Sequence, residues 1–363
     1  MKIRKIKLFD PFIDEKEEKE VTKILRSGFW ASGSGTKNVA KFEKLFNHYV
    51  GSDECVAVSS GTAALHLAFS LFDIKGKDVI LPSFSFVSTA HAVIYNGGRP
   101  VFVDVEQDSL CIDTESIKKH ITKKTKIILP VHFAGFPCKM KEISDLCNNH
   151  GLELVEDAAH AVGTKYSGKK IGSHGVAVCF SFHPIKNLAM PNGGAITLNS
   201  KQAQKFKKNL NSLRWCGISD RKMWTYDVKN LGWNFYMNEI SAGIGIQQLK
   251  KIGWMNKIRK EIAKKYSENL VFDTKIPFNK DCSYHIFWIL VKNRNRFMKK
   301  MLKKGIETGI HYLPIHKMSY YNSKKTLRKT ERASSQIVSL PIHPNLTKEE
   351  VEWIIKWGNE YSS

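Results

Sequence analysis

Residues 139–160 read KMKEISDLCNNHGLELVEDAAH, and this stretch contains the unit from which most of the chain is built. Lys139–His150 has the amphipathic pattern of a helix, and Leu152–Val155 is a short apolar run typical of a buried strand. The run ends in two carboxylates, Glu156 and Asp157. A helix that leads directly into a buried strand indicates crossover connections, and therefore a parallel sheet covered on both faces.

The same alternation continues through the first 250 residues, which predicts an α/β fold with a largely parallel sheet. The apolar runs expected to form strands are Glu54–Val58, Asp78–Leu81, Pro100–Val103, Lys126–Val131, Leu152–Val155, Val176–Phe182 and Ala195–Leu198. Amphipathic stretches between them include Thr62–Phe72, Lys139–His150 and Lys201–Arg214.

The character of the sequence changes after about residue 255. Basic helical patterns cover Lys257–Leu270, Arg296–Lys304 and Lys348–Trp357, and they flank a strand-like piece at Tyr284–Val291. We therefore predict a large domain with an N-terminal arm over residues 1–255 and a smaller α+β domain over residues 256–363.

The composition limits the class of protein. The seven cysteines are scattered and form no C-x-x-C pair, which argues against a disulfide framework or a zinc site and favours a reducing cytoplasm. No leader peptide is expected at the N-terminus, and no apolar run approaches the roughly 20 residues of a membrane span.

The net charge of +23 has two interpretations. The lysines are spread along the whole chain, which favours solvated helix faces, whereas a surface for a polyanion is the alternative. A DNA-binding regulator is a competing hypothesis, but the chain shows no convincing helix-turn-helix unit, zinc module or basic stretch interleaved with aromatic residues. We expect no nucleic-acid partner.

Candidate functional residues follow the predicted strands, because ligands of open α/β sheets bind at the carboxyl ends of strands. Ser59–Ala64 (SSGTAA) comes after the first strand and begins a helix, where a glycine turn and free N–H groups suit a phosphate. An ordinary helix cap is the alternative. The stretch lacks the lysine of a P-loop and the spacing of a dinucleotide motif.

Three further groups follow other strands. Phe86 lies after the second strand, where an aromatic ring can stack on a flat ligand. Asp157 needs a cationic or proton-donating partner if it is buried, and a pyridinium nitrogen is one. Lys186 follows a strand and Pro184, and a lysine held among apolar groups can attack a carbonyl to form a Schiff base. Together with the phosphate site, these are the groups that pyridoxal 5'-phosphate (PLP) requires. The ordinary alternatives are core packing for Phe86, a helix cap for Asp157 and a surface position for Lys186.

With these residues in place, the chain resembles the DegT/StrS family of PLP-dependent sugar-nucleotide aminotransferases. The resemblance runs from about Phe29 to Leu346 and is most specific over residues 156–194, EDAAHAVGTKYSGKKIGSHGVAVCFSFHPIKNLAMPNGG. It implies a fold-type-I PLP-dependent transferase, in which the large domain holds a mostly parallel seven-stranded sheet.

The resemblance also implies roles for particular residues. Lys186 would form the Schiff base and carry the proton, and Asp157 would pair with the pyridinium nitrogen. Asn234 would reach the phosphate bound by the partner subunit of a homodimer. The remaining implied cofactor residues are Gly61, Thr62, Phe86, His160 and Ser181, and the implied substrate residues are His183, His311 and Tyr312.

The reaction implied is transfer of an amino group, from L-glutamate, to the keto group of a nucleotide-linked sugar in a surface-polysaccharide pathway. A 4-keto-6-deoxyhexose and a 3-keto sugar both remain open. A lysine at position 186, where a deoxygenating branch has histidine, favours transamination. Tyr236 and Pro191-Asn192 depart from many relatives, which puts the substrate in doubt. A PLP-fold regulator or binding protein without transaminase activity is the alternative.

Overall fold

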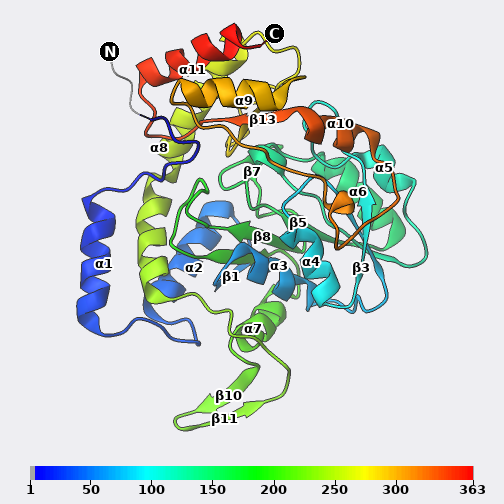
Figure 1. Ribbon diagram of the computed structural model, residues 1–363. Helices are drawn as coiled ribbons and strands as arrows, with labels where there is room; N and C mark the ends of the chain where they lie inside the picture. Colours follow the sequence, from blue (N-terminus) through cyan, green and yellow to red (C-terminus); the bar gives the residue numbers. More distant parts are fainter. Residues whose placement is uncertain (1–4, 363) are drawn as a thin grey trace.

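The computed structural model describes residues 5–362, and a seven-stranded sheet forms its centre (Figure 1). The strand order is β1-β9-β8-β5-β4-β2-β3. The strands are β1 (Glu54–Val58), β2 (Asp78–Pro82), β3 (Arg99–Val103), β4 (Thr125–Ile128), β5 (Glu153–Asp157), β8 (Ala177–Ser181) and β9 (Gly194–Leu198). All seven predicted strands are therefore confirmed.

The sheet is mostly parallel, as predicted. The strands β3, β2, β4, β5 and β8 pair in parallel, whereas β9 is antiparallel to both of its neighbours. The chain reverses between β8 and β9 without a crossover helix, so β9 starts where β8 ends. This reversal brings Gly194 opposite both Ser181 and Val58.

Some predicted boundaries differ from the observed ones for local reasons. The strand expected at Lys126–Val131 ends at Ile128, because Pro130 has no N–H group to donate to a neighbouring strand. The helix expected at Thr62–Phe72 is α3, Gly61–Phe69, and Ser60 caps it by accepting a hydrogen bond from the Ala63 N–H group at 3.1 Å.

Helices cover both faces of the sheet and bury two separate apolar clusters (Figure 1). The helix α3 is buried along nearly its whole length, which is why its sequence is apolar on all sides. The other helices of this part are α1 (Glu15–Ser27), α2 (Lys37–Val50), α4 (Ser88–Tyr95), α5 (Thr114–Lys118), α6 (Met140–His150) and α7 (Ala203–Leu213).

The C-terminal part combines helices with a two-stranded sheet. It contains β12 (Phe287–Leu290), β13 (Ile337–Leu340), α9 (Arg294–Lys303), α10 (Arg328–Gln336) and α11 (Lys348–Glu360). The predicted division at residue 255 falls inside one continuous helix, α8 (Glu239–Asn269), and it stays a prediction. Residues 1–4 of the predicted large domain and Ser363 of the small one lie outside the described residues.

A hairpin of β10 (Ile218–Lys222) and β11 (Thr225–Val228) projects away from the body of the molecule beyond α7 (Figure 1). Its apolar side chains face solvent, and Trp224 is 86% exposed. Within residues 5–362, no helix is both long and apolar enough to span a membrane.

The helix α2 anchors to the sheet through a cluster of aromatic rings. Phe46 is fully buried, and its ring centroid lies 5.0 Å from that of Phe180 and 5.2 Å from that of Phe182. Phe180 lies in the central strand β8 and Phe182 follows its end, next to Ser181, which is predicted to bind the cofactor. Edge-to-face packing of this kind adds to the burial of apolar area.

We predict that Phe46→Ala lowers the free energy of unfolding by about 3–5 kcal/mol, because it leaves a cavity among rings that cannot collapse. Urea denaturation of the cofactor-free protein measures this loss. The neighbouring Leu45→Ala, on the exposed side of α2, serves as control and should change stability by less than about 0.5 kcal/mol. Equal urea midpoints for Phe46→Ala and Leu45→Ala would contradict the anchoring role of Phe46.

Candidate active site

A cavity of about 410 Å³ opens at the carboxyl ends of β1, β2, β5 and β8. Ten of the eleven residues singled out from the sequence line it, and Asn234 is the exception. The ten are Gly61, Thr62, Phe86, Asp157, His160, Ser181, His183, Lys186, His311 and Tyr312. The sheet brings together residues from four strand ends and from the segment after residue 310.

The N-terminus of α3 forms an anion cradle on one side of the cavity. Gly61 and Thr62 are the first residues of the helix, where backbone N–H groups have no partner within the helix. A Cβ atom at Gly61 would lie 2.7 Å from the Cβ of Ser181, so only glycine lets the helix approach β8 this closely. The Ser181 hydroxyl therefore lies beside the same free N–H groups.

Asp157 ends β5 and is almost completely buried, with 4% of its surface exposed. Its Oδ2 accepts a hydrogen bond from the Thr89 hydroxyl at 2.8 Å, and its Oδ1 accepts one from the Ala159 N–H group at 3.1 Å. Burial raises the pKa of the Asp157 carboxyl, against these two hydrogen bonds and the charge of Lys186. A cation that enters the cavity beside Asp157 would therefore be strongly favoured.

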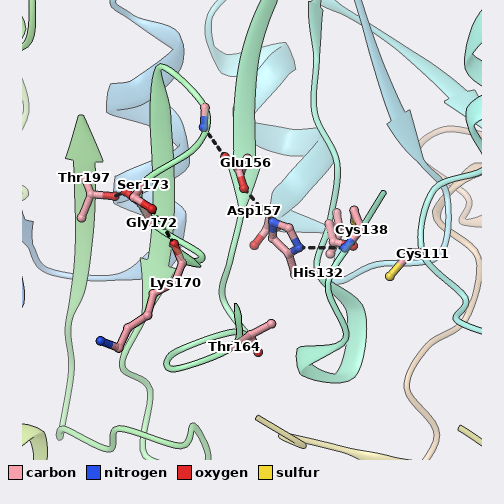
Figure 2. Close-up of polar contacts among 12 residues, drawn as sticks. Cys111, His132, Cys138, Glu156, Asp157, Thr164, Lys170, Gly172, Ser173 and Thr197 are labelled. Carbon is pink, nitrogen blue, oxygen red and sulfur yellow. Dashed lines mark hydrogen bonds and ion pairs between the residues drawn. The ribbon is translucent and has the colours of Figure 1, made fainter. Parts of the chain in front are cut away.

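A second polar network holds the backbone of Asp157 in place (Figure 2). The carboxylate of the preceding residue, Glu156, lies 2.7 Å from Nε2 of His132, and Nδ1 of His132 accepts from the Cys138 N–H group at 3.1 Å. The backbone N–H group of His132 in turn donates to the carbonyl of Asp157 at 3.0 Å. The buried contact between Glu156 and His132 thus fixes the segment around His132, which bonds to the end of β5.

Lys186 lies in the turn between β8 and β9, where its backbone N–H group donates to the backbone carbonyl of His183 at 2.8 Å. Burial lowers the pKa of Lys186 to about 8, and the charge of Asp157 opposes that shift. Its Nζ lies 3.4 Å from Nε2 of His285. A lysine of this pKa is partly neutral near pH 7 and is able to act as a nucleophile or a base.

His160 and Tyr312 both line the cavity and contact each other. Nδ1 of His160 accepts a hydrogen bond from the Ala134 N–H group at 3.2 Å, so the imidazole proton resides on Nε2. That nitrogen lies 3.1 Å from the hydroxyl oxygen of Tyr312. Burial lowers the pKa of His160 well below its usual range, and the charge of Lys186 adds to this effect.

The remaining predicted residues differ in exposure. Phe86 is 56% exposed although it lines the cavity, so one face of its ring is available for stacking. His183 is exposed at the rim, whereas His311 bonds the Ser339 hydroxyl through Nδ1 at 2.9 Å. Burial, followed by the charge of Lys186, lowers the pKa of His311 to about 4.

Asn234 lies away from the cavity of its own chain. It is exposed and forms an isolated antiparallel bridge with Trp215, near the base of the projecting hairpin. This placement does not test the prediction that Asn234 serves the partner subunit.

Sequence reasoning missed two polar residues of the site. Thr89 bonds Asp157 directly, and its hydroxyl lies 2.8 Å from that of Ser85. The spacing Ser85 to Thr89, four residues apart after a strand end, was the one available signal. His285 reaches Lys186 across 99 positions of sequence, and no local pattern could indicate such a contact.

Comparison with known proteins agrees with this geometry. Residues 11–357 match the DegT/DnrJ/EryC1/StrS aminotransferase family. The chain belongs to this family. It is also 35% identical to the uncharacterized protein MJ1066 of Methanocaldococcus jannaschii over 365 aligned positions, which cover 94% of each chain.

Solved structures of sugar aminotransferases have the same fold. PseC of Helicobacter pylori, an aminotransferase involved in the biosynthesis of pseudoaminic acid, is 28% identical with a TM-score of 0.93, and 99% of each chain is covered. Spr1654 of Streptococcus pneumoniae, solved in PLP and PMP forms, is 26% identical. Its PLP form has a TM-score of 0.92, with 99% of this chain and 98% of that chain covered.

As a member of the DegT/DnrJ/EryC1/StrS family, the protein is a PLP-dependent sugar aminotransferase with a fold-type-I architecture. The predicted family, fold class, enzyme class and cofactor are therefore confirmed. The cavity suits the cofactor, because it offers an anion cradle, an available aromatic face, a buried carboxyl and a buried amine in one space.

We predict that Gly61→Ala weakens PLP binding at least about tenfold, a loss of about 1.4 kcal/mol. The new methyl group would meet the Cβ of Ser181 and also its Cα at 3.2 Å. Because this Cα belongs to a central strand, moving it away would cost stability. Absorbance titration of the cofactor-free protein with PLP measures the affinity.

Gly253→Ala is the matched control, because a Cβ at that position of α8 would meet nothing within 4 Å. Unchanged PLP affinity in Gly61→Ala would show that the cradle is not the phosphate site.

Proposed function

We propose that this sugar aminotransferase transfers the amino group of L-glutamate to the keto group of a nucleotide-linked sugar, with Lys186 and Asp157 as its catalytic residues. The observation that carries the proposal is the presence in one cavity of a lysine whose pKa is about 8 and of the buried Asp157 carboxyl, which forms no ion pair with any described residue. These two groups have the properties that amine transfer requires at the two ends of one flat ligand.

Each predicted residue has a distinct part in holding the cofactor. Asp157 would pair with the pyridinium nitrogen, and the Thr89 hydroxyl would orient the carboxylate for this contact. Phe86 would stack on the ring. The other contacts are those of Gly61, Thr62 and Ser181 with the phosphate and of His160 with the ring hydroxyl.

When bound, PLP supplies an electron sink that makes the α-hydrogen of the amino donor acidic. Lys186 then acts through Nζ: it accepts the proton from the α-carbon as a neutral amine and returns it as an ammonium group. With a pKa of about 8, about a tenth of the free side chain is neutral at pH 7. That fraction makes Lys186 a usable general base without a separate activating group.

The substrate residues are His183, His311 and Tyr312, which line the same cavity as the anion cradle. Their mixture of imidazole, hydroxyl and aromatic groups suits a sugar ring. The similarity to PseC, an aminotransferase of pseudoaminic acid biosynthesis, supports a sugar as acceptor, and we propose that this sugar is nucleotide-linked. We favour a 4-keto-6-deoxyhexose, with a 3-keto sugar as the second candidate, in a pathway of surface-polysaccharide synthesis.

We further propose a cytoplasmic homodimer with shared active sites. The seven free cysteines favour a reducing compartment. The exposed apolar side chains of the β10–β11 hairpin require a partner surface, and the exposed Asn234 lies near the base of that hairpin. Asn234 would complete the phosphate site of the other subunit.

We predict that Lys186→Ala reduces turnover by at least roughly a hundredfold while the protein still binds PLP, because the general base is lost but the cradle remains. The absorbance spectrum with PLP is recorded before and after addition of L-glutamate. The wild-type band of bound PLP should bleach with glutamate, whereas the spectrum of Lys186→Ala should not respond.

Lys141→Ala, at an exposed position of α6, is the control and should behave as the wild type. Substantial turnover by Lys186→Ala would remove that residue from its role. A wild-type band that ignores glutamate would show that the amino donor has been misassigned.

Two hybrid dimers test the shared site, each purified through different tags on its two subunits. The first joins an Asn234→Ala subunit to a Lys186→Ala subunit. If Asn234 serves the partner, this hybrid keeps one intact site and about half of the wild-type activity at limiting PLP.

The second hybrid joins a wild-type subunit to a subunit that carries both changes, and it should be nearly inactive. The opposite pattern, an inactive first hybrid and a half-active second one, would place Asn234 in the site of its own chain. A monomeric wild-type protein would refute the dimer itself.

A further inference from the structure

His285 lies against Lys186, yet it belongs to the C-terminal part of the chain. It precedes β12 and is 1% exposed. Its Nε2 lies 3.4 Å from Nζ of Lys186. Among the described residues, this contact is the one hydrogen bond of the Lys186 side chain, so its geometry bears directly on where the amine points.

A single residue, Ala134, positions His285 and His160 together. The Ala134 carbonyl accepts the N–H group of His285 at 2.9 Å, and the Ala134 N–H group donates to Nδ1 of His160 at 3.2 Å. The two imidazole rings lie 4.5 Å apart. Ala134 has a φ of 59°, in the left-handed region, which turns its two peptide groups toward the two histidines.

The surroundings of His285 keep its imidazole neutral. The charged and titratable groups with the largest electrostatic effect on it are Lys186, His160, Arg259 and His311, which are all basic. On the other side, the ring of Phe9 stacks on the imidazole with centroids 5.5 Å apart. Burial, followed by the charge of Lys186, holds the pKa of His285 well below its usual range.

The direction of the hydrogen bond follows from this neutral state. An ammonium group only donates, so the Nε2 atom that faces Lys186 must be the acceptor. The imidazole proton then resides on Nδ1, which is buried and has no hydrogen-bond partner among the described residues. His285 is thus held as a hydrogen-bond acceptor for Lys186, on which the charge of Asp157 also acts.

We propose that His285 is a positioning residue for Lys186: its neutral Nε2 accepts a hydrogen bond from the ammonium group and aims the free amine into the cavity. The inference rests on the proposed role of Lys186. The proton balance is simple, because Lys186 takes one proton from the donor α-carbon and returns the same proton. His285 accepts a hydrogen bond but no proton.

Three substitutions separate this role from packing alone. His285→Phe keeps a flat ring beside Phe9 but removes the acceptor. His285→Gln keeps an acceptor, since its amide oxygen reaches about as far as Nε2. His285→Asn is equally polar but one carbon shorter, so it is the matched control for Gln in case the Phe variant fails to fold.

The first experiment uses the cofactor-free protein and does not depend on turnover. The rate at which acetic anhydride acylates Lys186 is followed against pH by peptide mass spectrometry, which reports the pKa of the amine. The acceptor stabilises the ammonium form, so its loss lowers the pKa. We expect a wild-type midpoint near 8, and a midpoint about one pH unit lower in His285→Phe and His285→Asn.

His285→Gln should return the midpoint toward that of the wild type. Midpoints that agree among the wild type and all three variants would overturn the proposal. A common shift in all three variants, Gln included, would also overturn it, because the change would then follow from packing and not from the acceptor.

The second experiment measures a single turnover of the PLP-loaded enzyme with L-glutamate across pH. His285→Phe and His285→Asn should react at least about tenfold more slowly than wild type at pH 7, with Gln in between. His150→Phe, an exposed exchange of the same kind at the end of α6, should match wild type.

The two experiments distinguish the possible failures. If wild-type enzyme does not react with glutamate, the proposed donor is wrong. The acylation midpoints of the cofactor-free protein still test the hydrogen bond between His285 and Lys186. If wild type reacts and His285→Phe equals it in rate and pH profile, the positioning role alone is refuted.

Discussion

The burial of the Asp157 carboxyl at the end of the central strand β5 is the constraint on which the rest of the site depends. A carboxylate in this position is unfavourable unless a cation or strong donors face it, and within residues 5–362 two donors contact it but no cation does. The buried Asp157 carboxyl therefore favours the binding of a positively charged ring nitrogen. The network of Glu156 and His132 behind it is rigid because every polar atom of that pair lies in the interior.

The same low-polarity environment lowers the pKa of the basic groups, whereas it raises the pKa of Asp157. It brings the pKa of Lys186 down to about 8 and keeps His160 and His285 neutral. One cavity therefore favours a charged cofactor nitrogen at Asp157 and raises the neutral fraction of the amine at Lys186. Since both effects arise from burial, substitutions that admit water should weaken both together, even when they touch neither residue.

The reversed strand β9 links the fold to this chemistry. Because β8 and β9 run antiparallel, the turn that carries Lys186 leads directly into Gly194, and the absence of a side chain at Gly194 lets the start of α3 approach. A crossover helix at this point would have separated the lysine from the phosphate cradle. The alternation of strand and helix along the sequence predicted the parallel strands and Asp157 at its strand end, since such patterns are local.

The sequence by itself determined the seven strands, the order of the chemical groups along the chain and, through residues 156–194, the family. These properties depend on side-chain periodicity and on short motifs, which a linear pattern records. Only the tertiary structure decided that Thr89 orients Asp157, that Ala134 holds two histidines, and that His285 reaches Lys186. Such contacts join distant segments through packing and burial, and no spacing along one chain specifies which distant polar atoms will meet in the interior.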